Sequence, residues 1–354
     1  MGISYIFYPS IHPLPDFGCN RVLLCLGINP NYTSTPFLST FIPQSHLYYT
    51  RFVRLHEIVS PSQNKTMHNK IKTLIAEKAF IKLYIYTIPT FLFFVFLFHF
   101  FPPAGVDWRF GFYQVAKNPL NPYEATHLFI NPPWLAVVLL PFGQLSEITS
   151  LAINASLNLV CIGLLVISRK GSWLALVLTL TSYPVLSVIA NGNIEWIIAL
   201  GFLLQNKWGL PLLLLKPQVG LLAILSWNSF RDNKPAFILP SLIVILISFA
   251  IWGNWIAGIS TNLQGLQNSQ LSIDVWNCSL FPWSVPIGLL FIYLILKYQP
   301  SYSEILGVIA TFCLVPYFAM YSTGVLFALI SASYKRLGIA LWVLLWLYPF
   351  IAPC

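Results

Sequence analysis

Charged side chains are scarce in this sequence. Of its 354 residues 8% are charged, whereas 57% are hydrophobic and 16% are aromatic. A soluble domain covers its surface with about 25% charged residues, so this composition excludes an ordinary water-soluble globular protein. The sequence instead predicts an integral membrane protein with several spans, whose outer surface contacts membrane lipids.

The sequence also lacks the common signatures of nucleotide and metal sites. It has no Walker A loop and no dinucleotide-binding glycine loop, and its six cysteines form no CxxC pair and no ligand spacing with histidine. We therefore predict neither a cofactor nor a metal. The net charge of +9 comes from short basic clusters between apolar runs, a distribution typical of membrane topology rather than of nucleic-acid binding.

The first part of the chain differs from the rest. Residues 1–66 are rich in proline, serine, asparagine and tyrosine, and their one apolar run, 22–28, is too short to span a membrane. We expect this segment to be poorly structured. Met67 opens a lysine-rich stretch followed by an apolar run, which is typical of a membrane protein with a cytoplasmic N-terminus. We hypothesise that translation begins at Met67 and that residues 67–354 form the membrane domain.

Apolar runs predict an all-α, polytopic transmembrane bundle. Two short runs, 211–215 and 219–227, meet at Lys216-Pro217-Gln218 and predict half-helices of a re-entrant hairpin, while 134–145 predicts a short interfacial helix. About nine other runs predict full spans. They are residues 81–101, 148–168, 173–190, 194–205, 236–257, 283–297, 302–321, 323–334 and 337–352.

Basic clusters predict the orientation of these spans. A cytoplasmic N-terminus places every cluster on the cytoplasmic side, as the positive-inside rule requires. The clusters are Arg169/Lys170, Lys207, Arg231/Lys234, Lys297 and Lys335/Arg336. We therefore expect a multi-pass protein of the plasma (inner) membrane that exposes the loop 102–147, the turn 191–193 and the loop 258–282 on its external face.

The external loop 102–147 contains the first candidate for chemistry. Asp107 lies about six residues past an apolar run, and an ionisable group so close to hydrocarbon is costly. Two interpretations are open. Asp107 is either a catalytic carboxylate that activates or orients an acceptor hydroxyl while a donor sugar leaves its phosphate, or an interfacial acid paired with Arg109.

Lys216 is the second candidate, because it places a cation between two apolar half-helices. A buried ammonium needs an anion, and a lipid phosphate also held by half-helix amides is one solution; a lysine that reaches the interface is the other. Glu195 follows the turn Asn191-Gly192-Asn193. It is predicted to pair with Lys216 or Arg109, or simply to favour a helix N-terminus.

Several motifs follow one another in residues 80–230. They are Asp107 with Tyr113 and Ala116, Asn121-Pro122-Tyr123, Ile130-Asn131-Pro132-Pro133-Trp134, Leu139-Leu140-Pro141-Phe142, Asn191-Gly192-Asn193, and Leu215-Lys216-Pro217-Gln218-Val219-Gly220-Leu221. This series resembles the integral-membrane glycosyltransferases of the GT-C superfamily, most closely the family 87 mannosyltransferase-like group. The sequence departs from that pattern at Asn131, where tyrosine is common, and at Gly192-Asn193, where Gly-Gln is common.

The resemblance implies a hexosyltransferase that moves a mannose-like sugar from a polyprenyl-phosphate carrier to a lipid or glycan acceptor. It would make Asp107 the catalytic carboxylate and Lys216 a contact to the carrier phosphate. The candidate substrate-binding residues are Lys216, Arg109, Glu195, Gln218, Asn193 and Tyr113. Two other functions stay open, a membrane transporter or flippase and a non-catalytic subunit of an envelope-polymer pathway.

Overall fold

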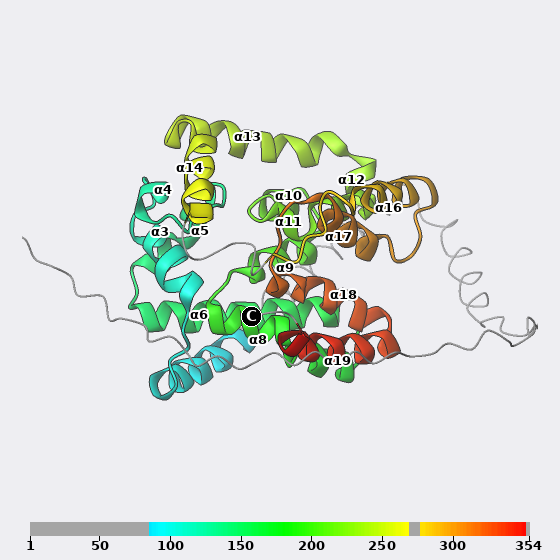
Figure 1. Ribbon diagram of the computed structural model, residues 1–354, viewed down its shortest axis with the longest axis horizontal. Helices are drawn as coiled ribbons and strands as arrows, with labels where there is room; N and C mark the ends of the chain where they lie inside the picture. The colour runs from blue at the N-terminus through cyan, green and yellow to red at the C-terminus, as the bar shows by residue number, and fades with distance from the viewer. Residues whose placement is uncertain (1–84, 269–276, 352–354) are drawn as a thin grey trace, which may run out of the picture. The chain divides into compact units, whose positions relative to one another are not determined.

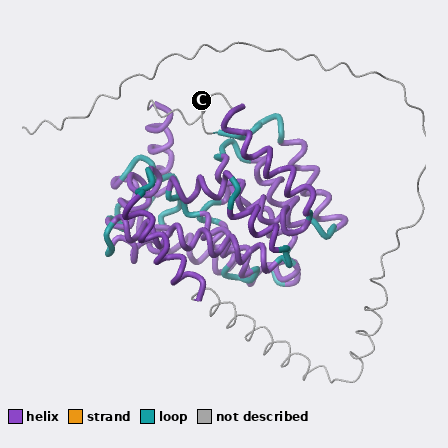
Figure 2. Tube along the Cα trace, turned by 90° about the horizontal axis from the view of Figure 1, so that it is seen from below, coloured by secondary structure: helices purple, strands orange, loops and turns teal. Residues whose placement is uncertain are grey.

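The computed structural model of the chain describes residues 85–268 and 277–351 (Figure 1). The predictions for the segment 1–66, for a start at Met67 and for the N-terminal orientation fall outside these described residues. The described residues form helices joined by loops (Figure 2), with one isolated β-bridge between Asn277 and Ala319. The all-α fold class is therefore confirmed for the described part of the chain.

The helices follow one another closely. After a first helix, Ile85–Phe100, come η1 (Trp108–Phe112, a π-helix), α3 (Tyr113–Lys117), α4 (Pro122–Ala125), α5 (Trp134–Gly143), α6 (Glu147–Ser168), α7 (Trp173–Leu180), α8 (Tyr183–Asn191), α9 (Glu195–Leu204), α10 (Gly209–Leu213), α11 (Pro217–Gly220), η2 (Leu221–Ser226), α12 (Asn228–Asp232), α13 (Lys234–Trp252), α14 (Trp255–Asn268), α16 (Val285–Tyr298), α17 (Ser303–Leu314), η3 (Met320–Thr323), α18 (Gly324–Ser333) and α19 (Lys335–Ile351).

α6 connects the parts of the fold that matter for the site. Ser146 caps its start, where the serine Oγ accepts a hydrogen bond from the backbone N–H of Thr149. The helix runs for 22 residues and packs against α5, α7, α8, α9 and α18. Because α6 contacts so many elements, polar side chains on it can reach segments that are distant in sequence.

Two described helices are long and apolar enough to cross a membrane. They are α6 and α13, and the pair α7 and α8, bent by 46° at a break, would make a third if it acts as one span. α13 exposes Ile238, Leu242 and Leu246 along its length. An apolar face of this kind is stable against lipid tails rather than water. These features are compatible with a membrane protein, and the nine spans stay a prediction.

Most predicted apolar runs are helices, but three have the wrong extent. The run 236–257 ends early at Trp252, because Gly253 takes a left-handed φ of 61°. The run 302–321 ends at Leu314, since Val315 precedes Pro316 and adopts an extended backbone. The run 173–190 breaks between α7 and α8, just before Pro184.

The chain is interrupted at Lys216, as predicted. α10 ends at Leu213, Lys216 leaves the helical conformation with φ −142°, and Pro217 opens α11. Proline suits this first helical position because it has no N–H to leave unpaired. Two short helices are thus confirmed around Lys216, while their entry into the membrane from one face stays a prediction.

α14 holds the first loop after the Ile85–Phe100 helix. The Asn262 amide Nδ2 donates to the backbone oxygens of Thr126 and Phe129, at 3.1 and 2.9 Å. Just before α14, the Trp252 indole Nε1 donates to the Pro119 oxygen at 2.9 Å. These bonds tie α14 and the end of α13 to the loop that contains Asp107.

Candidate functional site

Asp107 lies at the entry to the π-helix η1. The Gly105 N–H donates to the Ala190 oxygen at 2.9 Å, which ties this loop to the end of α8. Trp108 is completely buried, and its indole Nε1 donates to the Ser150 Oγ of α6 at 3.0 Å. The neighbouring residue Asp107 is therefore held in place while its side chain stays half-buried. π-Helical turns are rare and often occur at functional sites.

The turn after α8 brings Asn193 to Asp107. Asn193 is 3% exposed, and its Nδ2 donates to the Asp107 Oδ2 at 2.8 Å. Gly192 makes this approach possible, because it has a left-handed φ of 74° and a Cβ there would lie 2.4 Å from the Trp108 Cβ. The predicted turn residues thus contact the predicted carboxylate.

Lys216 and Glu195 form a buried ion pair beside Asn193. Glu195 has no exposed surface and Lys216 is 5% exposed, and the Lys216 Nζ bonds the Glu195 Oε1. The same Nζ donates to the Asn193 Oδ1 at 2.7 Å and lies 5.2 Å from the centre of the Tyr321 ring. The Ser322 hydroxyl also donates to Glu195, at 3.2 Å. The anion that a buried Lys216 requires is therefore supplied within the chain.

Two asparagines of α6 hydrogen-bond to the turn that contains Asn193. Asn154 and Asn158 are fully buried, one helical turn apart, and their Nδ2 groups donate to the Asn193 backbone oxygen at 3.0 and 2.7 Å. Their Oδ1 atoms accept bonds from the indole and backbone N–H groups of Trp196, at 3.0 and 2.8 Å. Neither asparagine was predicted as a site residue, although two asparagines spaced by four inside an apolar run are a visible signal in the sequence.

Three other candidate residues form no hydrogen bond or ion pair with the side chains of this cluster. Arg109 pairs with Glu147 at 2.9 Å, and therefore with neither Asp107 nor Glu195. The Tyr113 hydroxyl donates to the Leu145 oxygen at 2.9 Å, and Lys117 lies over the Tyr113 ring. Gln218 is half-buried and makes no hydrogen bond with another described residue. A substrate contact for each of the three stays a prediction.

The surroundings of Asp107 change its affinity for protons. Burial raises the pKa of this carboxyl above its ordinary value of 3.8, and the nearby negative charge of Glu195 acts in the same direction. The hydrogen bond from Asn193 and the positive charge of Lys216 lower the pKa and offset part of this rise. Asp107 is thus a stronger base than a solvent-exposed aspartate.

The second oxygen of Asp107 is free for a ligand. Oδ2 accepts the Asn193 bond, whereas Oδ1 is hydrogen-bonded by no residue that the structure describes. Within residues 85–268 and 277–351, no group of three or more histidine, cysteine, aspartate or glutamate side chains is placed to hold a metal. The geometry suits proton transfer to a partly accessible carboxylate that neighbouring bonds fix in position.

Comparisons with known proteins do not extend this assignment. No protein-family model matches the sequence, and neither a curated protein nor a solved structure gives a match. The likeness to family 87 glycosyltransferases therefore rests on the motifs alone.

Proposed function

We propose that this protein is a membrane-embedded glycosyltransferase of the GT-C type. It transfers a mannose-like hexose from a polyprenyl-phosphate carrier to a lipid or glycan acceptor on the external face of the plasma (inner) membrane. One observation supports the proposal most strongly. Asp107, Asn193 and Lys216, which come from three separate segments, form one continuous chain of bonds that ends at Glu195.

The point at which the Asp107 loop contacts α6 also supports a site at a membrane boundary. Ser150 binds Trp108 near the start of α6, and Arg169 follows its last residue. At about 1.5 Å per residue, these positions are roughly 28 Å apart, which is close to the thickness of the hydrocarbon core. Nine spans, with the N-terminus in the cytoplasm, are part of this proposal.

In the proposed reaction Asp107 is the base. Its Oδ1 accepts the proton of the acceptor hydroxyl, whose oxygen attacks the anomeric carbon of the donor sugar. The bond between that carbon and the phosphate oxygen breaks, and the polyprenyl phosphate leaves with the electron pair. Attack from the side opposite the phosphate inverts the anomeric configuration.

Lys216 and Asn193 act as positioning residues in this scheme. The Lys216 ammonium donates to Glu195 and Asn193, which uses two of its three N–H groups, and the residue is only 5% exposed, so little of it is accessible to the carrier phosphate. Its charge still acts on Asp107 through Asn193, in surroundings where electrostatic interactions are stronger than in water. We therefore assign the Glu195–Lys216 pair to the orientation and proton affinity of Asp107.

The pH dependence of transfer should report the environment of Asp107. Activity requires the charged carboxylate, so kcat/KM should fall with decreasing pH at a pKa above 3.8. Asn193→Ala removes a bond that stabilises the charged form, and the acidic limb should move to higher pH. Asn118→Ala, at an exposed asparagine of the loop that contains Asp107, is the control. A limb that Asn193→Ala leaves in place would contradict this role for Asn193.

Sugar transfer by the purified protein is the direct test. Radiolabelled mannose or glucose on a synthetic polyprenyl phosphate is offered together with a membrane lipid extract, and the labelled product is counted. We expect transfer from the polyprenyl-phosphate donor and none from the matching nucleotide sugar. Label that crosses a vesicle membrane without forming a new glycoside would instead indicate the transporter or flippase function.

A further inference from the structure

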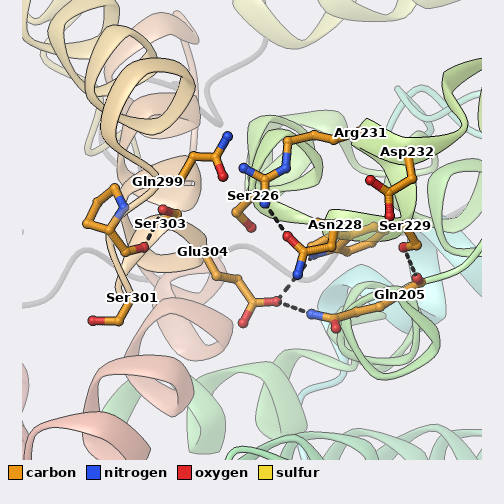
Figure 3. A pocket seen from close by; sticks show the side chains of 12 residues that line it. Gln205, Ser226, Asn228, Ser229, Arg231, Asp232, Gln299, Ser301, Ser303 and Glu304 are labelled. Carbon is orange, nitrogen blue, oxygen red and sulfur yellow. Dashed lines mark hydrogen bonds between the residues drawn. The ribbon is translucent and has the colours of Figure 1, made fainter. Parts of the chain in front are cut away.

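A second polar site lies beyond the other end of α6. A cavity of about 570 Å³ opens between two segments that are far apart in sequence (Figure 3). One wall comes from the end of α9 and from residues 226–232, and the other comes from the loop between α16 and α17. The volume falls in the range of small-molecule sites, and none of the Asp107 cluster lines it.

A half-buried ion pair fixes the walls of this cavity. The Glu304 carboxylate accepts two bonds from the Arg169 guanidinium, at 2.8 and 2.7 Å, and a third from the Gln205 amide at 2.8 Å. Ser229 ties its own segment to Gln205 through a 2.7 Å bond to the backbone oxygen. Because Arg169 balances the charge of Glu304, this carboxylate does not repel an anion that enters the cavity.

The free polar groups of the cavity favour a negatively charged ligand. Arg231 is half-buried, and one of its guanidinium nitrogens donates to the Asn228 Oδ1. The other guanidinium N–H groups bond to no residue that the structure describes, so they can bind a ligand. The exposed acid Asp232 lines the cavity as Arg231 does, and three exposed lysines lie outside the lining but within two residues of it in sequence. They are Lys207, Lys234 and Lys297.

The rest of the lining indicates a ligand with hydroxyl groups. Ser226, Ser301 and Gln299 add hydroxyl and amide groups to the lining, and Ser226 and Gln299 lie closer to Arg231 than Ser301 does (Figure 3). Serine oxygens can both donate and accept, and so they match the hydroxyl groups of a polyol. A bare phosphate ion would engage Arg231 but leave most of this polar surface without a partner.

We propose that this cavity binds a phosphorylated polyol, with Arg231 on the phosphate and the serine and glutamine side chains on the hydroxyl groups. Two sources provide this chemistry. One is an anionic phospholipid headgroup, whose acyl chains would follow the exposed apolar side of α13, which begins next to the lining residue Asp232. The other is a soluble polyol phosphate. This site is independent of the proposed transferase activity.

Binding to the purified full-length protein tests the proposal and separates the two sources. Native mass spectrometry counts bound phosphatidylglycerol against phosphatidylcholine, and calorimetry measures soluble glycerol 3-phosphate. We expect a preference for phosphatidylglycerol that Arg231→Gln weakens about ten-fold or more, because a charge-assisted bond to phosphate is lost. Glycerol 3-phosphate binding with the same dependence on Arg231, and no lipid preference, would assign the soluble source.

Two further variants distinguish a cavity from a generally basic surface. Arg336→Gln removes an exposed positive charge from a residue that does not line the cavity, and it should leave binding unchanged. Ser301→Trp keeps every charge but fills the space, and it should weaken binding as Arg231→Gln does. Equal losses in Arg231→Gln and Arg336→Gln, full binding by Ser301→Trp, or binding of none of the three probes would overturn the proposal.

Discussion

Replacing Asp107 by asparagine is expected to lower sugar transfer about 100- to 10,000-fold, the contribution of a positioned general base. Asparagine has nearly the same shape and keeps an oxygen that can accept the 2.8 Å bond from Asn193. It cannot take a proton from the acceptor hydroxyl. The measurement is initial-rate transfer from the polyprenyl-phosphate donor at matched protein amounts.

Glu124→Gln is the matched control for this variant. Glu124 lies in the same loop, but its side chain is exposed, and none of the hydrogen bonds of the Asp107 cluster involves it. Its replacement should leave the rate within about two-fold, since an exposed charge contributes little. Equal, undiminished rates in both variants would return Asp107 to a structural role and favour a non-catalytic subunit.

Replacing Lys216 by methionine is expected to have the largest effect on stability. The change leaves the fully buried Glu195 without a cation, and among the described residues only the Ser322 hydroxyl still donates to its Oε1. Breaking one side of a buried ion pair costs about 3–5 kcal/mol of the free energy of unfolding. Denaturant unfolding of the detergent-solubilised protein measures this loss.

A double variant separates the loss of the pair from the loss of lysine packing. Glu195→Gln together with Lys216→Met removes both charges, so it should recover much of the stability that Lys216→Met alone loses. Lys335→Met, at an exposed lysine, is the control and should change the free energy of unfolding by less than about 0.5 kcal/mol. A Lys216→Met protein as stable as the control would show that the pair contributes no stability.

The candidate site could be predicted in part because its residues are anomalies of the local sequence. An aspartate just past an apolar run, a lysine between apolar half-helices and a glutamate after a glycine turn are each visible without a structure. The partners of these residues could not be identified from the sequence. The sequence allowed Glu195 to pair with Lys216 or with Arg109. Only the fold shows that Glu195 pairs with Lys216 and that Arg109 pairs with Glu147.

Helix positions were predicted better than helix ends. Apolar composition is averaged over a run, so it locates a helix even when single residues stop it. Gly253 and Pro316 stop two predicted spans through their own backbone preferences, which an average over apolar residues ignores.

By itself the sequence determined the all-α fold and the identity of Asp107 and Lys216 as exceptional residues, and it predicted a membrane protein, with which the apolar helices α6 and α13 are compatible. These follow from composition and from close neighbours in the chain. Only the tertiary structure decided that Asn154 and Asn158 hold the turn at Asn193, and that residues 205, 226–232 and 299–304 enclose a polar cavity. Such contacts join segments up to about 100 residues apart, and they depend on how the helices pack rather than on any local pattern.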